Sequence, residues 1–593
     1  MNSGMPMGIL GFDAFFRKAT GHDPYPFQKR LAACDRLPEL IDIPTGLGKT
    51  DAVVLAWLWR KRFASQEVRD ATPRRLVYCL PMRVLVEQTR DKIRGKDEKK
   101  DEKDYGWLEW LGMRGTEPGD NNLVDGWAKD QGDQGKRIAV TVLMGGEDKG
   151  EWDRYPERDA IIIGTQDMLL SRALNRGYGM SRYRWPVHFG LLNNDCMWVM
   201  DEVQLMGRGF TTSLQMQAFR DMLGTMGSSN IKTIWMSATL EREWMNTVDH
   251  KQQTGNSTAF ALNHEDLNFP GIKSRMSAVK TLRKTSAGAG DMRALAEEIL
   301  QKHKPETRTL VVQNTVRRAV DIHSAIKKMD KDVNLILVHS RFRPLDRKKV
   351  VENLLKKPDS RGTIVVSTQV VEAGVDISSQ TMFTELAPWP SLVQRFGRCN
   401  RSGESGDSEV YWIEVPTGEE SLAPPYEVED LDNARKILVD HDRNSVGPGS
   451  LPDVPIPFDH EQIVRRKDLL DLFDTTTDLA GNDLDISRFI RESSDTDVQV
   501  FWRDVNEKGP EDSEPRPHRN ELCSVHLADI GDLVRKGVRA WLWDSLEGLW
   551  TPVNRGDPYS PRNHFHASPG RWSLYTCRRL EHPVKRTSTR GSN

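Results

Sequence analysis

The sequence predicts an α/β protein built on parallel sheets, and two observations carry this prediction. Short β-branched runs recur along the chain, with helix-like stretches such as Ala52–Phe63 and Val84–Ile93 between many of them. This alternation is typical of parallel sheets covered by helices. The chain is 593 residues long, which exceeds one hydrophobic core and favours about three domains. The strand-like runs are Leu76–Leu80, Ile138–Leu143, Ala160–Gly164, Met197–Met200, Thr233–Met236, Thr309–Val312, Asn334–Val338 and Thr363–Ser367.

The alternation of strands and helices falls into two blocks. It pauses between about Thr247 and Asp291, where the chain is polar and contains Gly and Ser. Beyond about Val415 the composition becomes rich in Pro and Asp and the alternation stops. We therefore expect a first α/β domain at 1–250, a connection at 251–290 with room for a strand of its own, a second α/β domain at 291–415 and a C-terminal accessory region at 416–593.

The segment Gly95–Arg137 interrupts the first block. It opens with the charged run Lys96–Lys103 and then becomes rich in glycine. Such a composition predicts a solvated surface insertion. Trp107 and Trp110 lie inside it, and they leave open a contact with a partner or with a nucleic-acid strand.

Composition excludes several classes of protein. The 84 Lys and Arg residues nearly balance the 86 Asp and Glu residues, so overall charge gives no sign of nucleic-acid binding, although a large protein can confine a positive field to one channel. The longest apolar runs are strand-sized, which predicts no membrane span, and the N-terminus lacks the basic residues of a signal peptide. The six cysteines form no CxxC pair, so we expect neither zinc nor disulfides and a reduced, cytoplasmic setting.

The segment from Pro44 to Thr50 has the features of a phosphate-binding loop, because it follows an apolar strand and precedes a helix. Gly46 and Gly48 allow a tight turn that directs backbone amides at phosphate oxygens. Lys49 would reach the β- and γ-phosphates, and the Thr50 hydroxyl would bind Mg²⁺. The alternative is a glycine turn with a surface lysine. The predicted nucleotide-binding loop is Pro44, Thr45, Gly46, Leu47, Gly48, Lys49 and Thr50.

An acidic pair, Asp201 and Glu202, ends the apolar strand Met197–Met200. The carboxyl end of a strand is where α/β sheets place ligands. Asp201 would hold Mg²⁺, and Glu202 would orient and deprotonate an attacking water. An isolated acidic pair is usually solvated surface, but its position after a phosphate loop makes it specific. We expect Gln204 to couple the two domains.

Two further motifs flank this site. Ser237-Ala238-Thr239 follows the strand Thr233–Met236, so its hydroxyls could bridge the acidic site to the second domain; a strand-end turn is the alternative. Near the N-terminus, Tyr25-Pro26-Phe27-Gln28 predicts that Gln28 reads an adenine edge beside an aromatic ring.

The second block carries an arginine-rich motif, Gln394-Arg395-Phe396-Gly397-Arg398-Cys399-Asn400-Arg401. The spacing of Arg398 and Arg401 predicts one helical face. Two guanidinium groups on that face would reach a γ-phosphate across a cleft and stabilise the charge of phosphoryl transfer. Gln394 would position nucleotide or water. A patch for phosphate backbones or a solvated helix face is the alternative.

Taken in order, these motifs resemble those of superfamily 2 helicases from Tyr25 to Arg401, about two-thirds of the chain. The resemblance implies two tandem RecA-like domains plus a C-terminal accessory region. Within the superfamily, four phrases look like the CRISPR-associated helicase of type I interference systems. They are Leu80–Gln88, Gly164–Asp167, His339–Phe342 and Thr368–Asp376. The segments Asp468–Thr476 and Ser487–Arg491 look like the type I-G (formerly I-U) variant.

The resemblance implies a motor that uses ATP and Mg²⁺ to translocate on single-stranded DNA, the displaced strand of an R-loop, after recruitment by a crRNA-guided surveillance complex. It assigns catalytic roles to Glu202, Asp201, Lys49, Arg398, Arg401 and Gln394. It adds Gln28, Gly374 and Asp376 to the nucleotide site. Contacts to strand phosphates, which are blind to sequence, would come from Arg83, Gln88, Thr165 and Thr368.

The HD nuclease that accompanies such helicases has no recognisable counterpart in this sequence. His-Asp doublets occur only at His22-Asp23 and His441-Asp442, and neither has a plausible set of histidine partners. We therefore expect no nuclease activity in this chain, with a separate HD nuclease or a shortened form of the protein as the explanation. Two alternatives stay open: another superfamily 2 translocase of repair or restriction, and a non-enzymatic recruitment platform, which the intact Lys49, Glu202 and Arg398 argue against.

Overall fold

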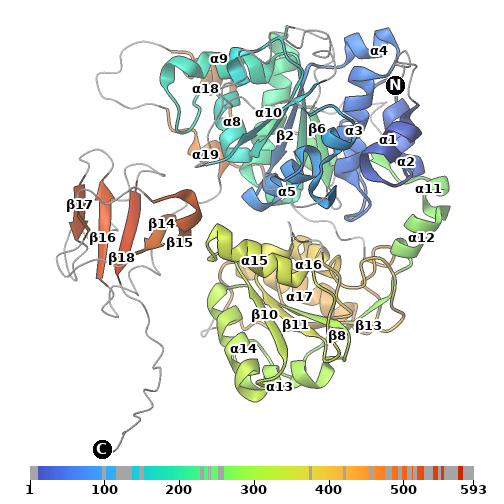
Figure 1. Ribbon diagram of the computed structural model, residues 1–593, viewed down its shortest axis with the longest axis vertical. Helices are drawn as coiled ribbons and strands as arrows, with labels where there is room; N and C mark the ends of the chain where they lie inside the picture. The colour runs from blue at the N-terminus through green and yellow to red at the C-terminus, as the bar shows by residue number, and fades with distance from the viewer. Residues whose placement is uncertain are drawn as a thin grey trace, which may run out of the picture.

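The computed structural model contains two α/β lobes stacked along the long axis of the molecule, with a smaller β-sheet beside them (Figure 1). The described residues are 11–96, 102–114, 137–145, 152–226, 233–237, 240, 242–251, 259–372, 375, 377–418, 422–452, 454, 458–474, 484–491, 497–503, 510–511, 517–526, 539–544, 549–552 and 572–577. No helix among them combines the length and the apolar character that a bilayer crossing requires.

The first lobe is a seven-stranded sheet in the order β3-β4-β2-β5-β6-β1-β7, and all of its strand pairs are parallel. Its strands are β1 (Leu40–Asp42), β2 (Arg75–Leu80), β3 (Ala139–Leu143), β4 (Ala160–Thr165), β5 (Cys196–Asp201), β6 (Thr233–Ser237) and β7 (Phe260–Ala261). Its helices are α1 (Phe12–Thr20), α2 (Pro26–Ala33), α3 (Lys49–Arg62), α4 (Gln66–Ala71), α5 (Arg83–Arg94), α6 (Trp107–Trp110), α8 (Gln166–Ala173), α9 (Trp185–Asn193) and α10 (Arg208–Leu223).

Strand β2 shows why the central strands read as continuous apolar runs. Leu76, Tyr78 and Leu80 belong to the hydrophobic core on the side of α3, whereas Val77 and Cys79 belong to the core on the opposite face. Successive side chains of a strand point to opposite faces, and helices cover both faces here. All six positions of β2 are therefore buried.

The second lobe is a six-stranded sheet in the order β10-β11-β9-β12-β13-β8, again parallel throughout. Together the two sheets confirm the predicted fold class, and every predicted strand has its counterpart in one of them. The strands are β8 (Lys280–Lys284), β9 (Arg308–Val312), β10 (Asn334–Val338), β11 (Thr363–Ser367), β12 (Thr381–Glu385) and β13 (Ser408–Ile413). The helices are α13 (Met292–Lys302), α14 (Val316–Met329), α15 (Pro344–Leu354), α16 (Trp389–Phe396) and α17 (Val428–Asp440).

The boundary between the lobes differs from the predicted connection at 251–290, because that segment contains a strand of each sheet. Strand β7 pairs with β1 and extends the first sheet, while β8 pairs with β13 and forms the edge of the second. Only α11 (His264–Asn268) and α12 (Pro270–Met276) lie between them. The pattern hid these strands because β7 has only two residues and β8 is an edge strand with three basic residues.

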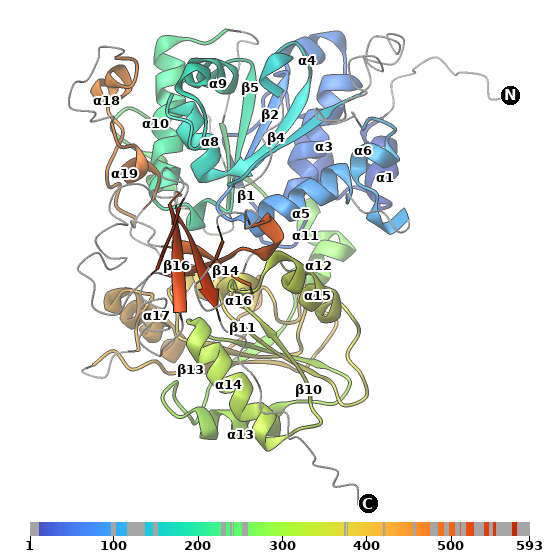
Figure 2. The same cartoon turned by 60° about the vertical axis from the view of Figure 1, so that its left-hand side comes forward.

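The C-terminal region is divided among three places. Helix α17 packs into the core of the second lobe through Leu431 and Leu438. Helices α18 (Arg466–Asp471) and α19 (Ser487–Ile490) pack on the first lobe through Leu469 and Phe489. Five described strands after Ile490 form a small sheet, which Figure 2 brings forward, in the order β15-β14-β18-β16-β17. Its strands are β14 (Asp497–Trp502), β15 (Cys523–His526), β16 (Arg539–Asp544), β17 (Leu549–Pro552) and β18 (Trp572–Cys577).

Part of the predicted surface insertion packs against the first lobe instead. Trp107 of α6 is buried in the core that α3 and α5 line, and the Lys92 ammonium lies 5.3 Å from the centre of its ring. The prediction of a solvated insertion is therefore wrong for Trp107, Leu108 and Met113, which are buried. Trp110 is exposed, and residues 115–136 lie outside the described residues.

Candidate active site

The candidate site lies at the carboxyl edge of the first sheet. Strand β6 separates β1 from β5 in the sheet order, with Asp42 opposite Ser237 and Asp201 opposite Met236. Because all three strands are parallel, the phosphate loop after β1 and the acidic pair at the end of β5 emerge at the same edge. Motifs that are about 150 residues apart in the sequence thus become neighbours, as predicted.

The phosphate loop has the backbone shape that its glycines predict. Gly46 and Gly48 have φ angles of 86° and 80°, in the left-handed region that side chains rarely adopt. A Cβ at Gly48 would lie 3.0 Å from the Gln28 amide nitrogen. Lys49, only 7% exposed, donates from Nζ to the Ile43 carbonyl at 3.0 Å. The lysine therefore spans the loop, which excludes the alternative of a surface lysine and fits the cradle that a phosphate needs.

A buried phenol joins the two residues predicted to bind Mg²⁺. The Tyr78 hydroxyl donates to Asp201 Oδ2 at 2.6 Å and lies 3.2 Å from Thr50 Oγ1. The other oxygen of this carboxylate, Asp201 Oδ1, accepts from the backbone N–H of Glu202 at 2.9 Å. Glu202 itself has a φ of 55°, a conformation that non-glycine residues rarely adopt.

The pKa values of the two carboxyl groups in the acidic pair are shifted in opposite directions. Burial and the charge of Glu202 raise the pKa of Asp201 to about 6, against the opposing effect of Lys49. Burial alone would raise the pKa of Glu202 as well. The Lys49 ammonium, hydrogen bonds from Gln204 and Gln394, and the charge of Arg398 outweigh burial and lower the pKa of Glu202 below its usual range. Glu202 is thus held as a carboxylate that can accept a proton.

Glu202 also contacts the second lobe. Its Oε2 accepts from Gln204 Nε2 at 2.7 Å and from Gln394 Nε2 of the second lobe at 3.1 Å. Ser237 donates from Oγ to Gln204 Oε1 at 2.8 Å. The predicted link from Ser237 and Gln204 to the second domain therefore runs through the acidic residue itself. Ala238 and Thr239 lie outside the described residues.

Two arginines of the second lobe lie near the first lobe, and a turn rather than a helix carries them. Helix α16 ends at Phe396, so the prediction that Arg398 and Arg401 share a helical face is wrong. Asn400, with a φ of 43°, bends the chain between them. Arg398 donates from Nη2 to the Glu372 carbonyl at 2.6 Å, and a Cβ at Gly46 would lie 3.2 Å from Arg401 Nε. The turn therefore places both guanidinium groups beside the first lobe.

Sequence reasoning missed two residues that touch this site. Arg275 of α12 donates to the Gly46 carbonyl, and nothing in its surroundings in the sequence pointed to that contact. Tyr78 was overlooked as part of an apolar strand. Its hydroxyl, a polar group on a run buried on both faces, was the signal that could have identified it, because such groups need a partner inside the protein.

Gln28 makes its contacts within the protein. The side chain is 2% exposed, its Oε1 accepts from the Tyr25 N–H at 2.8 Å, and its Nε2 donates to the Gly48 carbonyl at 3.1 Å. These bonds hold the phosphate loop against α2. Adenine recognition by Gln28 stays a prediction, and Tyr25 packs edge-to-face on Phe269 with the ring centres 5.5 Å apart.

The residues predicted to contact strand phosphates fall into two groups. Arg83 and Gln88 lie exposed on α5. Thr165, at the end of β4, and Thr368, after β11, are buried, so their hydroxyls are covered in this arrangement of the lobes. Gly374 and Asp376 lie outside the described residues.

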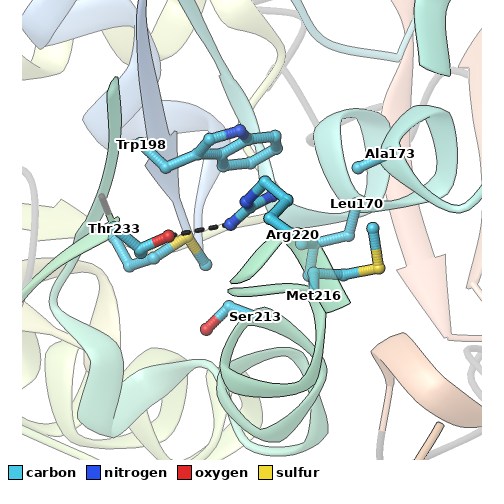
Figure 3. Close-up of a pocket in the computed structure, with 8 residues that line it drawn as sticks. Leu170, Ala173, Trp198, Ser213, Met216, Arg220 and Thr233 are labelled. Atoms are coloured by element: carbon cyan, nitrogen blue, oxygen red, sulfur yellow. Dashed lines mark hydrogen bonds between the residues drawn. The ribbon is translucent and has the colours of Figure 1, made fainter. Parts of the chain in front are cut away.

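A small pocket elsewhere in the first lobe is distinct from this site (Figure 3). It lies between the sheet and helices α8 and α10, and Arg220 Nη2 donates there to Thr233 Oγ1 at 2.9 Å. No predicted site residue lines it. Within the described part of the chain, no group of three or more His, Cys, Asp or Glu side chains is arranged to hold a metal ion, and the absence of a nuclease stays a prediction.

A phosphate loop on one parallel sheet, met by arginines from a second, is the arrangement that the resemblance to superfamily 2 helicases predicts, and the chain is similar to proteins of that class. Among these helicases, the chain is similar to Cas3-type CRISPR-associated helicases. Residues 305–404 match the family model described as "CRISPR-associated nuclease/helicase Cas3, C-terminal". This match covers β9, β10, β11, β12 and the arginine motif of the second lobe.

Individual relatives extend the match over most of the chain. It is 27% identical over 452 residues to a putative CRISPR-associated nuclease/helicase Cas3 of Myxococcus xanthus, covering 74% of this chain and 51% of that protein. It is 24% identical over 385 residues to the CRISPR-associated helicase Cas3 of Thermoproteus tenax, covering 63% and 56%. The chain thus spans about half the length of these relatives.

The solved structure of T. fusca Cas3 with AMPPNP has the same fold. The TM-score is 0.57 at 15% identity, and the superposition covers 87% of this chain and 66% of that one.

Proposed function

We propose that this chain is an ATP-dependent translocase on single-stranded DNA that acts in CRISPR interference. One observation carries the proposal: the arginine turn of the second lobe lies against the phosphate loop of the first, with Arg401 beside Gly46. A motor that couples hydrolysis to movement needs its nucleotide between two lobes, so that phosphate chemistry changes the contact between them. The Cas3 relatives support the assignment to CRISPR interference.

The residues of the site fit a magnesium nucleotide. The loop amides and Lys49 would hold the phosphates, and Thr50 and Asp201, whose side chains meet around the Tyr78 phenol, would hold Mg²⁺. When bound, the ion supplies positive charge that neutralises the phosphate oxygens. The solved T. fusca Cas3 structures with AMPPNP and with ATP support a nucleotide at this position.

The protein's own residues would divide the remaining work. Glu202, which its hydrogen-bond donors hold as a carboxylate, would orient the attacking water and accept its proton. Gln394 would position that water or the nucleotide from the second lobe. Arg398 and Arg401 would stabilise the charge that builds on the transferred phosphoryl group. Hydrolysis would then remove the group that both lobes hold and release them from each other.

The DNA strand would run over the exposed residues of α5. Arg83 and Gln88 face solvent there, and phosphate contacts give a motor a grip that does not depend on sequence. Recruitment by a crRNA-guided complex and the supply of an HD nuclease by a separate chain complete the proposal, on the strength of the family resemblance.

The test is ATP hydrolysis by the purified chain alone, with single-stranded DNA and with single-stranded RNA, together with a metal-dependent DNA cleavage assay. The Lys49→Ala variant is the control for contaminating ATPases, since it removes the phosphate-binding ammonium. Strong stimulation by DNA without cleavage supports a DNA motor whose nuclease lies on another chain. Stimulation by RNA alone, or by neither nucleic acid, overturns the proposal.

A further inference from the structure

We propose that Tyr78 is a positioning residue of this site, and that its phenol holds Thr50 and Asp201 at the spacing that binds Mg²⁺. The inference rests on the proposed function, because it concerns the ion that the nucleotide would bring. Tyr78 touches neither substrate nor ion in this proposal. It acts through the two side chains that its hydroxyl contacts.

The position of Tyr78 follows from the sheet. It lies on β2, directly opposite Val199 of the neighbouring β5, so Asp201 is two residues further along the adjacent strand. Its side chain is fully buried on the face that α3 covers, and Thr50 is in the first turn of α3. The phenol therefore reaches the one place where the end of β5 and the start of α3 come together.

The hydrogen bonds at this phenol have one consistent direction. A tyrosine hydroxyl has a single proton and two acceptor positions. The short 2.6 Å contact gives that proton to the Asp201 carboxylate, so the Thr50 hydroxyl, 3.2 Å away, donates its own proton to the phenol oxygen. The lone pairs of Thr50 Oγ1 are then left to face a cation.

Hydrogen bonds hold both carboxylate oxygens of Asp201 in this arrangement. Oδ2 accepts from Tyr78 and Oδ1 accepts from the Glu202 N–H at 2.9 Å. Groups that hydrogen-bond to metal ligands, rather than to the ion itself, orient those ligands and raise metal affinity by about 10- to 100-fold. A buried hydroxyl is costly to retain without hydrogen bonds, and both hydrogen-bond partners of Tyr78 are residues of the proposed magnesium site.

The test separates the hydroxyl from the ring. Tyr78→Phe keeps the ring in the core and removes only the two contacts. Mg²⁺ is titrated into the full chain with a fluorescent non-hydrolysable ATP analogue, and Mn²⁺ binding is followed by electron paramagnetic resonance. Binding of the analogue in EDTA is measured in parallel. We expect the affinity for the metal to fall by about tenfold or more, with the metal-free affinity for the analogue unchanged.

A matched control is available in the second lobe. The Tyr411 hydroxyl donates to Glu409 Oε2 at 2.9 Å, so Tyr411→Phe removes an equivalent phenol–carboxylate bond far from the site and should leave metal affinity unchanged. Tyr78→Met, which also lacks the hydroxyl but packs with a flexible chain, provides a second variant if Tyr78→Phe folds poorly. Thermal unfolding of each variant shows whether it is folded.

The outcomes distinguish this inference from the proposed function. If the wild-type chain binds no magnesium nucleotide, the proposed function itself has failed. If the wild type binds it and the folded Tyr78 variants bind the metal within twofold of the wild type, only the role of Tyr78 is overturned. An equal loss in EDTA would also overturn it, because it would mean that the phenol supports the nucleotide site as a whole.

Discussion

Gln394 of the second lobe donates a hydrogen bond of 3.1 Å to Oε2 of Glu202 in the first lobe. The proposed base of hydrolysis is therefore itself one of the contacts between the lobes. A second donor, Gln204, binds the same oxygen at 2.7 Å. When the lobes separate, Glu202 loses one of the donors that keep it ionised. The geometry thus couples the readiness of the base to the closure of the cleft.

Replacing Glu202 by glutamine should leave ATP bound and stop its hydrolysis. The amide has nearly the shape of the carboxylate but accepts no proton, so we expect the rate to fall by roughly 10²- to 10⁴-fold, the usual contribution of a general base. Binding of a fluorescent ATP analogue and steady-state hydrolysis measure the two properties. Glu297→Gln, at an exposed position on α13, is the control. Normal turnover by Glu202→Gln would remove Glu202 as the base.

Replacing Arg398 by alanine should slow hydrolysis by roughly a thousandfold or more, as for other arginine fingers. Its charge acts on Glu202, and its backbone follows the end of α16. The control is Arg293→Ala, which removes an arginine with an 85% exposed side chain. A loss of less than tenfold would transfer the main role to Arg401, and the Arg401→Ala variant should then show the larger defect.

Replacing Gly46 by alanine should reduce hydrolysis more than stability. A left-handed φ costs a non-glycine residue about 1–2 kcal/mol, and the new Cβ would also press on the guanidinium of Arg401 at 3.2 Å. Gly21→Ala is the matched control, with a φ of 78° and no atom within 4 Å of its Cβ position. Thermal unfolding should show similar losses for both variants, whereas only Gly46→Ala should lose ATPase activity. Equal activities would argue against the contact.

The first lobe should lose stability as the pH falls from about 6.5 towards 4, in part through His188. Burial lowers the pKa of His188 to about 4, despite the neighbouring Asp153. In this pH window the unfolded chain binds a proton at His188 and the folded chain does not. The free energy of unfolding is therefore lower by about 2 kcal/mol at pH 5 than at pH 7.

Chemical unfolding at pH 7 and at pH 5 measures this effect of His188. The folded His188→Gln variant should lose less stability over that range than the wild type. The control, His264→Gln, changes an exposed residue of α11 and should behave as the wild type. An unchanged pH dependence in His188→Gln would contradict the prediction.

The sequence predicted the sheets well because parallel strands covered on both faces leave continuous apolar runs. It missed β7 and β8, which are short or charged edge strands, and it also left β12 and β13 out of the predicted runs. The C-terminal region was taken as one unit because composition shows that the alternation stops, but not which surface each helix covers. Leu431 and Leu469 are similar residues in similar helices, yet they pack on different lobes.

The candidate site was predictable where chemistry demands particular residues at a strand end, as at Lys49 and Glu202. It was not predictable where a contact depends on how the lobes meet. The helical face expected for Arg398 and Arg401 followed from spacing alone, and the end of α16 at Phe396 could not be read from that spacing. Arg275 reaches Gly46 across a distance of 229 positions in the chain, which no local pattern records.

The division of the C-terminal region has a mechanical consequence. The chain leaves the first lobe through α11 and α12, builds the second lobe, and returns after Val446 to pack Val464 and α18 on the first lobe. The lobes are therefore joined by two strips of covalent chain at separate points. Two connections at separate points restrict the relative motion of the lobes more than a single linker would.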